Sequence, residues 1–234
     1  MDSSNRQFGF KRGLGCVNAI FRVRKVIDHF TSNNSTVNIC TVDLSKAFDR
    51  VIHDVLFVKL MDRRVPLCLL TCIMNWYSKM FCCVKWGNAL SVVFGITAGV
   101  RQGGILSPAL FSVYVNGILT KLAQSNRGCF IQHECVNSFM YADDLILLAI
   151  SIRDLQLLVD RCDCEFKGIG MIINSKKTSC LRVGKRHTNS ALPITVGINN
   201  VIWKSELKYL GITLLSANVF KTINNWQGRN TFVR

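Results

Sequence analysis

The chain has 234 residues and a hydrophobic content of 49%, which supports a substantial core and excludes a disordered protein. Its 29 Lys and Arg residues outnumber 14 Asp and Glu, and the formal charge of +15 favours a polyanionic partner such as nucleic acid over an ordinary basic protein. This charge is concentrated in two acid-free stretches, 6–25 and 166–205, which flank a middle part that holds most of the carboxylates.

Hydrophobic periodicity and turn residues predict the elements of the first half. In chain order these are a helix over 14–30, a strand over 37–42, helices over 51–62 and 67–80, and a hairpin over 81–95. The first helix is amphipathic with a basic polar face. The strand is apolar and stops at Asp43, whereas Pro66 suits a helix start and Gly87-Asn88 suits a tight turn. Residues 98–104 are rich in glycine and predict a loop that can approach a ligand closely.

The second half alternates helices with short strands. Its predicted elements are a buried helix from 106 or 107 to 123, a hairpin over 138–150, an amphipathic helix from 151 to about 166, and strands over 179–183, 194–198, 201–204 and 207–213. Ser107 is the expected N-cap of the first helix, with Pro108 at its first position. Ser151 opens a capping box, and Gly168 and Gly170 end that helix. Without repeats or low-complexity linkers, the elements should form subdomains of one unit.

Cysteine usage and the N-terminus favour an intracellular protein with reduced thiols. The chain has 11 cysteines, an odd number, and its first residues lack the apolar segment of a signal peptide. Candidate zinc ligands are Cys82-Cys83, Cys162-x-Cys164, and Cys129 with His133 and Cys135. None of these has paired CxxC spacing, so burial as small apolar side chains is favoured. No apolar run approaches the roughly 18 residues of a membrane span, and no membrane partner is expected.

Two adjacent carboxylates, Asp143 and Asp144, lie at the tip of the hairpin predicted over 138–150. Like charges held close together oppose the ionisation of both, and a divalent cation removes that cost. Mg²⁺ is usually bound by one or two carboxylates plus substrate phosphates. With Asp43 at the end of another strand, the set fits two metal ions about 3.5–4 Å apart. Taken alone, an Asp-Asp pair is more simply a solvated turn.

Six motifs argue against that simpler interpretation. They are QFGFKRG at 7–13, VDLSKAFDRVIHDVL at 42–56, GVRQGGILSPALF at 99–111, YADD at 141–144, INSKKT at 173–178 and KYLGI at 208–212. In this order they resemble the motifs of reverse transcriptases, most closely those of non-LTR (LINE-type) retrotransposons, from Gln7 to about Leu214. Each motif alone is weak to moderate, whereas all six in order are highly specific.

The resemblance implies an α+β fold: a polymerase palm, with an antiparallel sheet backed by helices, and partial fingers in a right-hand architecture. The implied division is partial fingers at 1–36, palm with the first catalytic aspartate at 37–66, a fingers–palm insertion at 67–98, palm with the YADD hairpin at 99–190, and a primer-positioning region at 191–234, truncated before the thumb. The family's upstream fingers strand and any endonuclease, RNase H or zinc-knuckle domain are not recognised. We therefore expect a fragment or a decayed copy.

The resemblance also implies roles for residues at matching positions. Asp43, Asp143 and Asp144 would hold two Mg²⁺ ions, with Mn²⁺ as an alternative. The Leu44 carbonyl would be a further ligand, and Asp143 the stronger metal ligand of the adjacent pair. Phe48 would be the steric gate that leaves no room for a ribose 2′-hydroxyl, although without the surrounding motif a core phenylalanine would be the preferred interpretation.

Further implied contacts concern the nucleotide and the nucleic acid. The substrate-binding positions are Gln102, Gly103, Gly104, Tyr141 and Lys177. For Lys177, a solvated surface lysine is the alternative interpretation. The positions that would contact template phosphates or the primer end are Arg22, Arg24, Lys25, Tyr209, Leu210 and Gly211.

The implied reaction is attack of a DNA primer 3′-hydroxyl on the α-phosphate of a dNTP, directed by an RNA template, with no cofactor beyond the metal. The implied location is a cytoplasmic ribonucleoprotein and the nucleus. Three alternatives stay open: an inactive remnant that binds nucleic acid by charge, an RNA-dependent RNA polymerase of the same palm architecture, and a group II intron-type reverse transcriptase. Phe48 argues against the RNA-dependent RNA polymerase, although the adjacent Asp49 keeps that alternative open. The sequence SKAFDRVIH at 45–53 and the lack of a maturase region disfavour the group II intron-type reverse transcriptase.

Overall fold

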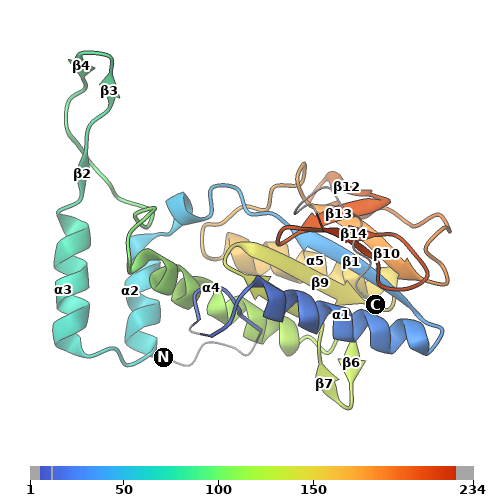
Figure 1. Ribbon diagram of the computed structural model, residues 1–234. Helices are drawn as coiled ribbons and strands as arrows, with labels where there is room; N and C mark the ends of the chain where they lie inside the picture. Colours follow the sequence, from blue (N-terminus) through green and yellow to red (C-terminus); the bar gives the residue numbers. More distant parts are fainter. Residues whose placement is uncertain (1–5, 12, 225–234) are drawn as a thin grey trace.

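A computed structural model of the chain describes residues 6–11 and 13–224, so Arg12 and the two ends of the chain lie outside the described residues (Figure 1). Its centre is a six-stranded sheet. In spatial order the strands are β11 (Ile194–Val196), β12 (Asn199–Trp203), β10 (Ser179–Gly184), β1 (Thr36–Val42), β9 (Asp144–Ala149) and β8 (Ser138–Tyr141). All neighbours pair antiparallel except β10 and β12, which are parallel. The expected antiparallel sheet is therefore present with one parallel pair.

The sheet separates two hydrophobic clusters because successive side chains of a strand point to opposite faces. In β1, Cys40 and Val42 join one cluster, and Val37 and Ile39 join the other. Helices α4 (Ser107–Ala123) and α5 (Ile152–Lys167) cover the first face, and α2 (His53–Asp62) packs on α4. The second face is covered by α1 (Cys16–Ser32) and by a small sheet of β13 (Glu206–Tyr209), β14 (Ile212–Leu215) and β15 (Thr222–Asn224).

An arm projects from this layered body (Figure 1). It comprises α3 (Leu67–Ser78) and the short strands β2 (Phe81–Cys82), β3 (Lys85–Trp86), β4 (Ala89–Leu90) and β5 (Phe94–Gly95). β2 pairs with β5 and β3 pairs with β4, with Gly87 at φ 58° in the turn between them. The hairpin predicted over 81–95 is thus confirmed, with interrupted strands.

Several predicted boundaries need correction. Ser107 is the first residue of α4 and not its N-cap, a position that Leu106 occupies without a side-chain hydrogen bond. The strand predicted over 207–213 is the β13–β14 hairpin, because Leu210 and Gly211 have φ of 46° and 84° and reverse the chain. The 3-10 helix η1 (Phe48–Arg50) and the hairpin of β6 (Phe130–Ile131) and β7 (Glu134–Cys135) were not predicted. The Ser151 cap is confirmed: its side chain accepts a hydrogen bond from the Asp154 N–H.

Burial of the candidate zinc-ligand cysteines is confirmed only in part. Cys129 and Cys162 are buried, whereas Cys82, Cys83 and Cys164 are exposed. Cys82 and Cys83 are exposed because they lie on the projecting arm, where little core surrounds them. Over 6–11 and 13–224, no helix is long and apolar enough to cross a membrane.

Candidate active site

Asp43 follows the last residue of β1, the strand between β9 and β10. Its N–H donates to Thr178 Oγ1 at 3.3 Å, and its carbonyl accepts from the Asn174 N–H at 2.8 Å. Leu44 then forms an antiparallel bridge with Ile173. The hydrogen bonds of this bridge are made by the neighbouring residues: Asn174 N–H donates to the Asp43 carbonyl, and Ser45 N–H donates to the Ile172 carbonyl. The Leu44 carbonyl therefore points away from Ile173. Residues 173–178 therefore hold the backbone that carries Asp43.

Asp143 and Asp144 lie at the tip of the β8–β9 hairpin, as predicted. Ala142 and Asp143 form the turn, with Ala142 at φ 56°, and Tyr141 pairs with Asp144 across it. β9 also pairs with β1, where Leu145 lies opposite Val42. One step further along these antiparallel strands, Asp144 lies beside Asp43. The fold thus gathers the three aspartates from segments a hundred residues apart in sequence.

The three carboxylates repel one another. Desolvation raises the pKa of Asp144 from 3.8 to about 6, and the charges of Asp143 and Asp43 contribute in the same direction. A carboxyl group that resists ionisation in this way gains from a nearby cation. The arrangement is therefore unfavourable for the ionised apo protein and favourable for a site that receives a divalent cation.

We expect Asp144→Asn to stabilise the metal-free protein at pH 7.5 and to have no effect on stability near pH 4. The folded-state pKa lies above the unfolded one, so the destabilisation by this carboxyl is absent below pH 4 and grows as the pH rises through 6. The shift would correspond to about 3 kcal/mol at most, and solvent screening of this exposed side chain reduces it to on the order of 1 kcal/mol. Urea unfolding in the presence of a chelator measures it. A parent and variant with the same stability at both pH values would contradict the expectation.

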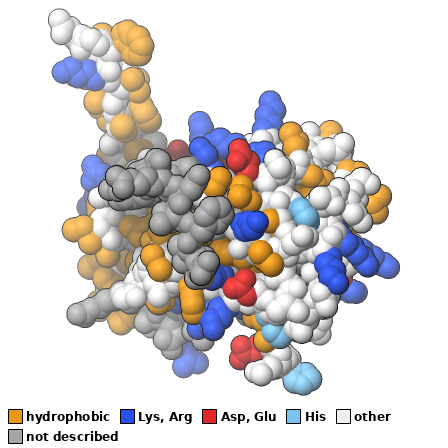
Figure 2. All heavy atoms as spheres, turned by 45° about the vertical axis from the view of Figure 1, so that its right-hand side comes forward, with side chains coloured by type: hydrophobic (Ala, Val, Ile, Leu, Met, Phe, Trp, Pro, Cys, Tyr) orange, Lys and Arg blue, Asp and Glu red, His pale blue; other side chains and the backbone are white. Residues whose placement is uncertain are grey.

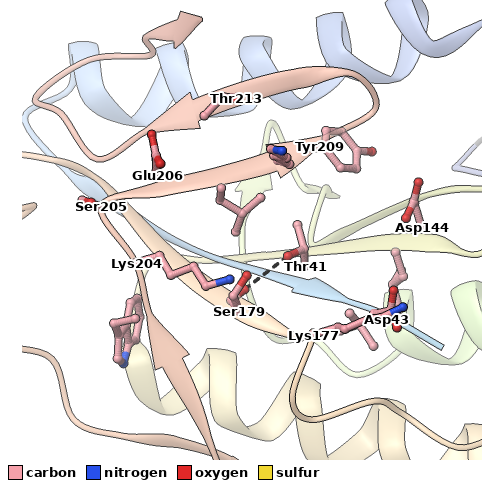
Figure 3. A pocket seen from close by; sticks show the side chains of 15 residues that line it. Thr41, Asp43, Asp144, Lys177, Ser179, Lys204, Ser205, Glu206, Tyr209 and Thr213 are labelled. Atoms are coloured by element: carbon pink, nitrogen blue, oxygen red, sulfur yellow. Dashed lines mark hydrogen bonds between the residues drawn. The ribbon is translucent and has the colours of Figure 1, made fainter. Parts of the chain in front are cut away.

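A cleft of about 670 Å³ opens beside these carboxylates, and Figure 3 shows its lining. Asp43, Asp144 and Lys177 lie together at one end of the view. Lys204 and Lys208 also line the cleft. No role was predicted for these two lysines, although Lys204 lies in the acid-free stretch 166–205 and Lys208 opens the KYLGI motif. Together with the carboxylates, the three lysines suit a site that holds a metal ion and a polyanion.

Tyr209 closes the cleft near Asp144 (Figure 3). Its side chain is only 4% exposed, and its hydroxyl has no hydrogen-bond partner among the described residues. Burial and the charge of Asp144 raise the pKa of this hydroxyl. Leu210 and Gly211 form the adjacent turn, where Gly211 is exposed. The exposed turn can therefore contact a ligand more readily than the buried Tyr209 ring can.

Phe48 begins η1, five residues after Asp43. Its ring stacks on Phe111, with 4.5 Å between ring centroids, and meets the edge of Phe10 at 6.4 Å. These contacts hold the ring in one orientation. The 98–104 loop is tied to η1, because the Val100 N–H donates to the Phe48 carbonyl at 2.8 Å.

Of the predicted substrate residues of that loop, Gln102 and Gly103 are exposed and Gly104 is half-buried. Gln102 donates through Nε2 to Asp49 Oδ1 at 3.0 Å. Gly103 has φ 82°, which disfavours other residues, and a Cβ at Gly104 would lie 2.8 Å from Ser107 Oγ. The positive φ of Gly103 and the close approach of Gly104 to Ser107 therefore favour glycine at both positions, besides leaving space for a ligand.

The basic face of α1 is separate from the cleft. None of the α1 residues predicted to contact template phosphates lines the cleft. Arg24 pairs with Asp28 at 3.2 Å and lies over the Phe220 ring, and Lys25 lies over the Phe21 ring. Arg22 is exposed. This face presents cations to solvent on the side of the sheet that carries β13–β15.

The QFGF segment packs on the carboxylate hairpin, a role that the sequence did not indicate. Gln7 forms a parallel bridge with Met140, and the Phe8 N–H donates to the Met140 carbonyl at 2.8 Å. A Cβ on Gly9 would lie 2.3 Å from the Ala142 nitrogen. Only glycine therefore fits against the turn that carries Asp143.

Residues 1–214 match the family described as reverse transcriptase (RNA-dependent DNA polymerase). The Pol polyprotein of the retrotransposable element R2DM of Drosophila melanogaster is 30% identical, with 88% of this chain and 20% of that protein covered. The RNA-directed DNA polymerase from the mobile element jockey of Drosophila funebris is 29% identical, with 92% and 24% covered. The chain thus spans about a fifth of the length of the curated relatives that it matches.

Two solved structures have a similar fold. Apo telomerase from Candida tropicalis aligns with a TM-score of 0.65 at 10% identity, over 94% of this chain and 37% of that one. Telomerase from Candida albicans, in complex with a fragment of telomeric RNA, aligns with the same TM-score of 0.65 at 12% identity, over 94% and 36%. At such identities the likeness concerns the fold alone. It agrees with the α+β palm expected from the motifs.

Proposed function

Because the chain belongs to the reverse transcriptase family, we propose that it carries the RNA-directed DNA polymerase core of a non-LTR retrotransposon protein. The observation that carries this proposal is the meeting of Asp43 with Asp143 and Asp144 at one end of the central sheet. Desolvation, together with the charges of Asp143 and Asp43, raises the pKa of Asp144, as expected for a carboxyl group at a site that receives a cation. We propose a cytoplasmic ribonucleoprotein and the nucleus as the places of action, where template RNA and target DNA would meet.

The aspartates fit two Mg²⁺ ions, or Mn²⁺ in their place, together with the Leu44 carbonyl. All of these donors are oxygens, which suits such hard cations. The described residues hold no group of three or more His, Cys, Asp or Glu already arranged around a metal. Mg²⁺ commonly takes only one or two carboxylates and completes its shell with water and substrate phosphates. When bound, the ions stabilise the attacking and leaving oxygens of an in-line displacement.

The chain's own residues would position the dNTP and the primer. Lys177, at the edge of the cleft, would neutralise the triphosphate and the leaving pyrophosphate. The Phe48 ring, held by Phe111, would exclude a 2′-hydroxyl. The backbones of Gly103 and Tyr141 would border the nucleotide, with Gln102 and Gly104 completing the loop. Attack by the primer 3′-hydroxyl on the α-phosphate then depends on position and charge, and base pairing supplies specificity.

Two other surfaces would hold nucleic acid. Arg22, Arg24 and Lys25 would contact template phosphates without reading sequence, supported by the exposed basic face of α1. The β13–β14 turn at Leu210 and Gly211, backed by Tyr209, would position the primer end. These contacts predict binding that weakens steeply with salt.

We propose the family's subdomains with the boundaries stated above: partial fingers at 1–36, palm at 37–66 and 99–190, an insertion at 67–98 and a primer-positioning region at 191–234. The projecting arm supports the insertion. β11 and β12 belong to the same sheet as β10, so we propose that they act with the palm although they follow residue 190.

The test is primer extension on an RNA template with Mg²⁺ and dNTPs. DNA synthesis that requires all three components would support the proposal. Incorporation of ribonucleotides at comparable rates would favour an RNA-dependent RNA polymerase instead. Salt-sensitive template binding without extension would identify a remnant that only binds nucleic acid.

We expect Gly9→Ala to lower the extension rate about tenfold while the protein still folds. The added methyl group would displace the Ala142 backbone and with it Asp143, and small misplacements at a reacting centre are costly. Gly15→Ala, a nearby glycine with φ −126° whose Cβ would have only Asn18 Oδ1 at 4.0 Å, is the control for general effects of the substitution. Equal rates for Gly9→Ala and the parent would show that the turn tolerates the shift.

A further inference from the structure

A second cavity, of about 430 Å³, lies where α3, the base of the arm and the 98–104 loop meet. Its lining includes Trp76, Lys79, Phe81, Arg101 and Gln102. It shares Gln102 with the candidate active site, whereas its other lining residues have no role in the proposed chemistry. The cavity therefore adjoins the active-site loop without being part of the carboxylate cleft.

The two aromatic side chains of this cavity are unusually exposed. Trp76 is 46% exposed and Phe81 is 66% exposed. Aromatic rings are large apolar groups, and leaving them in water forgoes a substantial part of their burial energy. Surfaces that bind single-stranded nucleic acid combine exposed aromatic rings, on which bases stack, with nearby cations.

Among the described residues that line the cavity, basic side chains outnumber carboxylates. From residue 63 to residue 133 the sequence contains no Asp or Glu. The basic residues of that stretch are Arg63, Arg64, Lys79, Lys85, Arg101, Lys121 and Arg127. Among the described residues that line the cavity, the only carboxylate is Asp49, which accepts a hydrogen bond from Gln102. Figure 2 shows hydrophobic and basic side chains on the projecting arm. This surface complements an anion that also offers flat apolar faces.

We propose that this cavity binds single-stranded template RNA, with a base stacked on Trp76 and Phe81 and the adjoining phosphates on Lys79 and Arg101. The identification of the strand as template rests on the proposed function. Because Gln102 lies in both places, a strand that passes the 98–104 loop can reach the cavity directly. The cavity would thereby hold the template beside the active site, without reading its sequence.

The test is the affinity of the chain for a fluorescently labelled 20-nucleotide single-stranded RNA, measured by anisotropy without metal or dNTP. Trp76→Ala and Phe81→Ala should each weaken binding about tenfold, the scale of one base–aromatic stack. A Lys79→Gln, Arg101→Gln double variant should reduce the slope of log affinity against log salt by about 1.4, since each phosphate contact on a single strand contributes about 0.7.

The matched control is a Trp86→Ala, Lys85→Gln double variant. These residues are of the same types and lie on the same arm, with Trp86 85% exposed, but they do not line the cavity. We expect less than a twofold change for this control. If it weakens binding as much as the cavity variants, the arm binds RNA diffusely and the cavity is not a site. If the cavity variants bind RNA as the parent does, the exposed rings serve another partner, such as a protein, and the proposal is overturned.

The outcome is separate from that of the proposed function, because the assay needs no catalysis. An Asp143→Asn, Asp144→Asn variant should bind the same RNA at least as tightly as the parent. Cavity-dependent binding in a chain that extends no primer would support the subsite and contradict the polymerase proposal. Primer extension by the parent, together with parental RNA binding by the cavity variants, would support the polymerase proposal and contradict the subsite.

Discussion

Asp143→Asn and Asp144→Asn, singly or together, should each reduce the rate of primer extension by at least about a thousandfold. Each substitution replaces an anionic oxygen with a neutral amide where the proposed metal ions would stabilise the attacking and leaving oxygens. Such stabilisation is worth several kcal/mol, and each 1.36 kcal/mol corresponds to a factor of ten. The side chains keep their size, so the hairpin turn between β8 and β9 should be preserved.

This expectation is measured by single-turnover extension of a DNA primer on an RNA template, at saturating Mg²⁺. Asp163→Asn is the matched control, because Asp163 pairs with Lys167 on α5, away from the cleft. Its rate should stay within about twofold of the parent. Extension by either active-site variant at more than a tenth of the parental rate would remove that carboxylate from the proposed metal site.

Phe48→Val should lower the discrimination between dNTP and rNTP by about a hundredfold. In the parent, a 2′-hydroxyl would be forced against a ring that cannot retreat, because it stacks on Phe111 at 4.5 Å and meets Phe10. Forcing an extra group into a packed site costs roughly 1–3 kcal/mol, which is up to about a hundredfold in specificity. The smaller valine leaves room for the hydroxyl.

The measured quantity is the ratio of kcat/KM for a dNTP to that for the matching rNTP. Using a ratio cancels losses in overall activity that follow from weaker packing. Phe111→Leu is the control, since it loosens the same ring pair from the core side. We expect it to reduce stability while changing the ratio much less than Phe48→Val does. Equal ratios in the parent and in Phe48→Val would leave Phe48 as a packing residue only.

The sequence alone predicted those features that depend on neighbours a few residues apart. The tip of the carboxylate hairpin follows from two apolar runs around Asp143 and Asp144, and the start of α5 follows from the Ser151 hydroxyl and a backbone N–H three residues later. The failures at this level were small. Leu210 adopts a positive φ that a leucine seldom takes, so the β13–β14 turn was not predicted from composition.

Tertiary structure decided everything that depends on pairing across long separations. That Asp43 lies beside Asp144 follows from the register of β1 with β9, and no local pattern specifies which strands pair. No local pattern specifies that Gly9 packs against the Ala142 turn, or that Trp76 and Arg101 line one cavity. Local propensity acts through hydrogen bonds and sterics within one turn or hairpin, whereas these contacts form only when the hydrophobic faces of distant elements are buried together. The sequence by itself thus determined the family and its carboxylates, and only the fold brought the carboxylates into one electrostatic site.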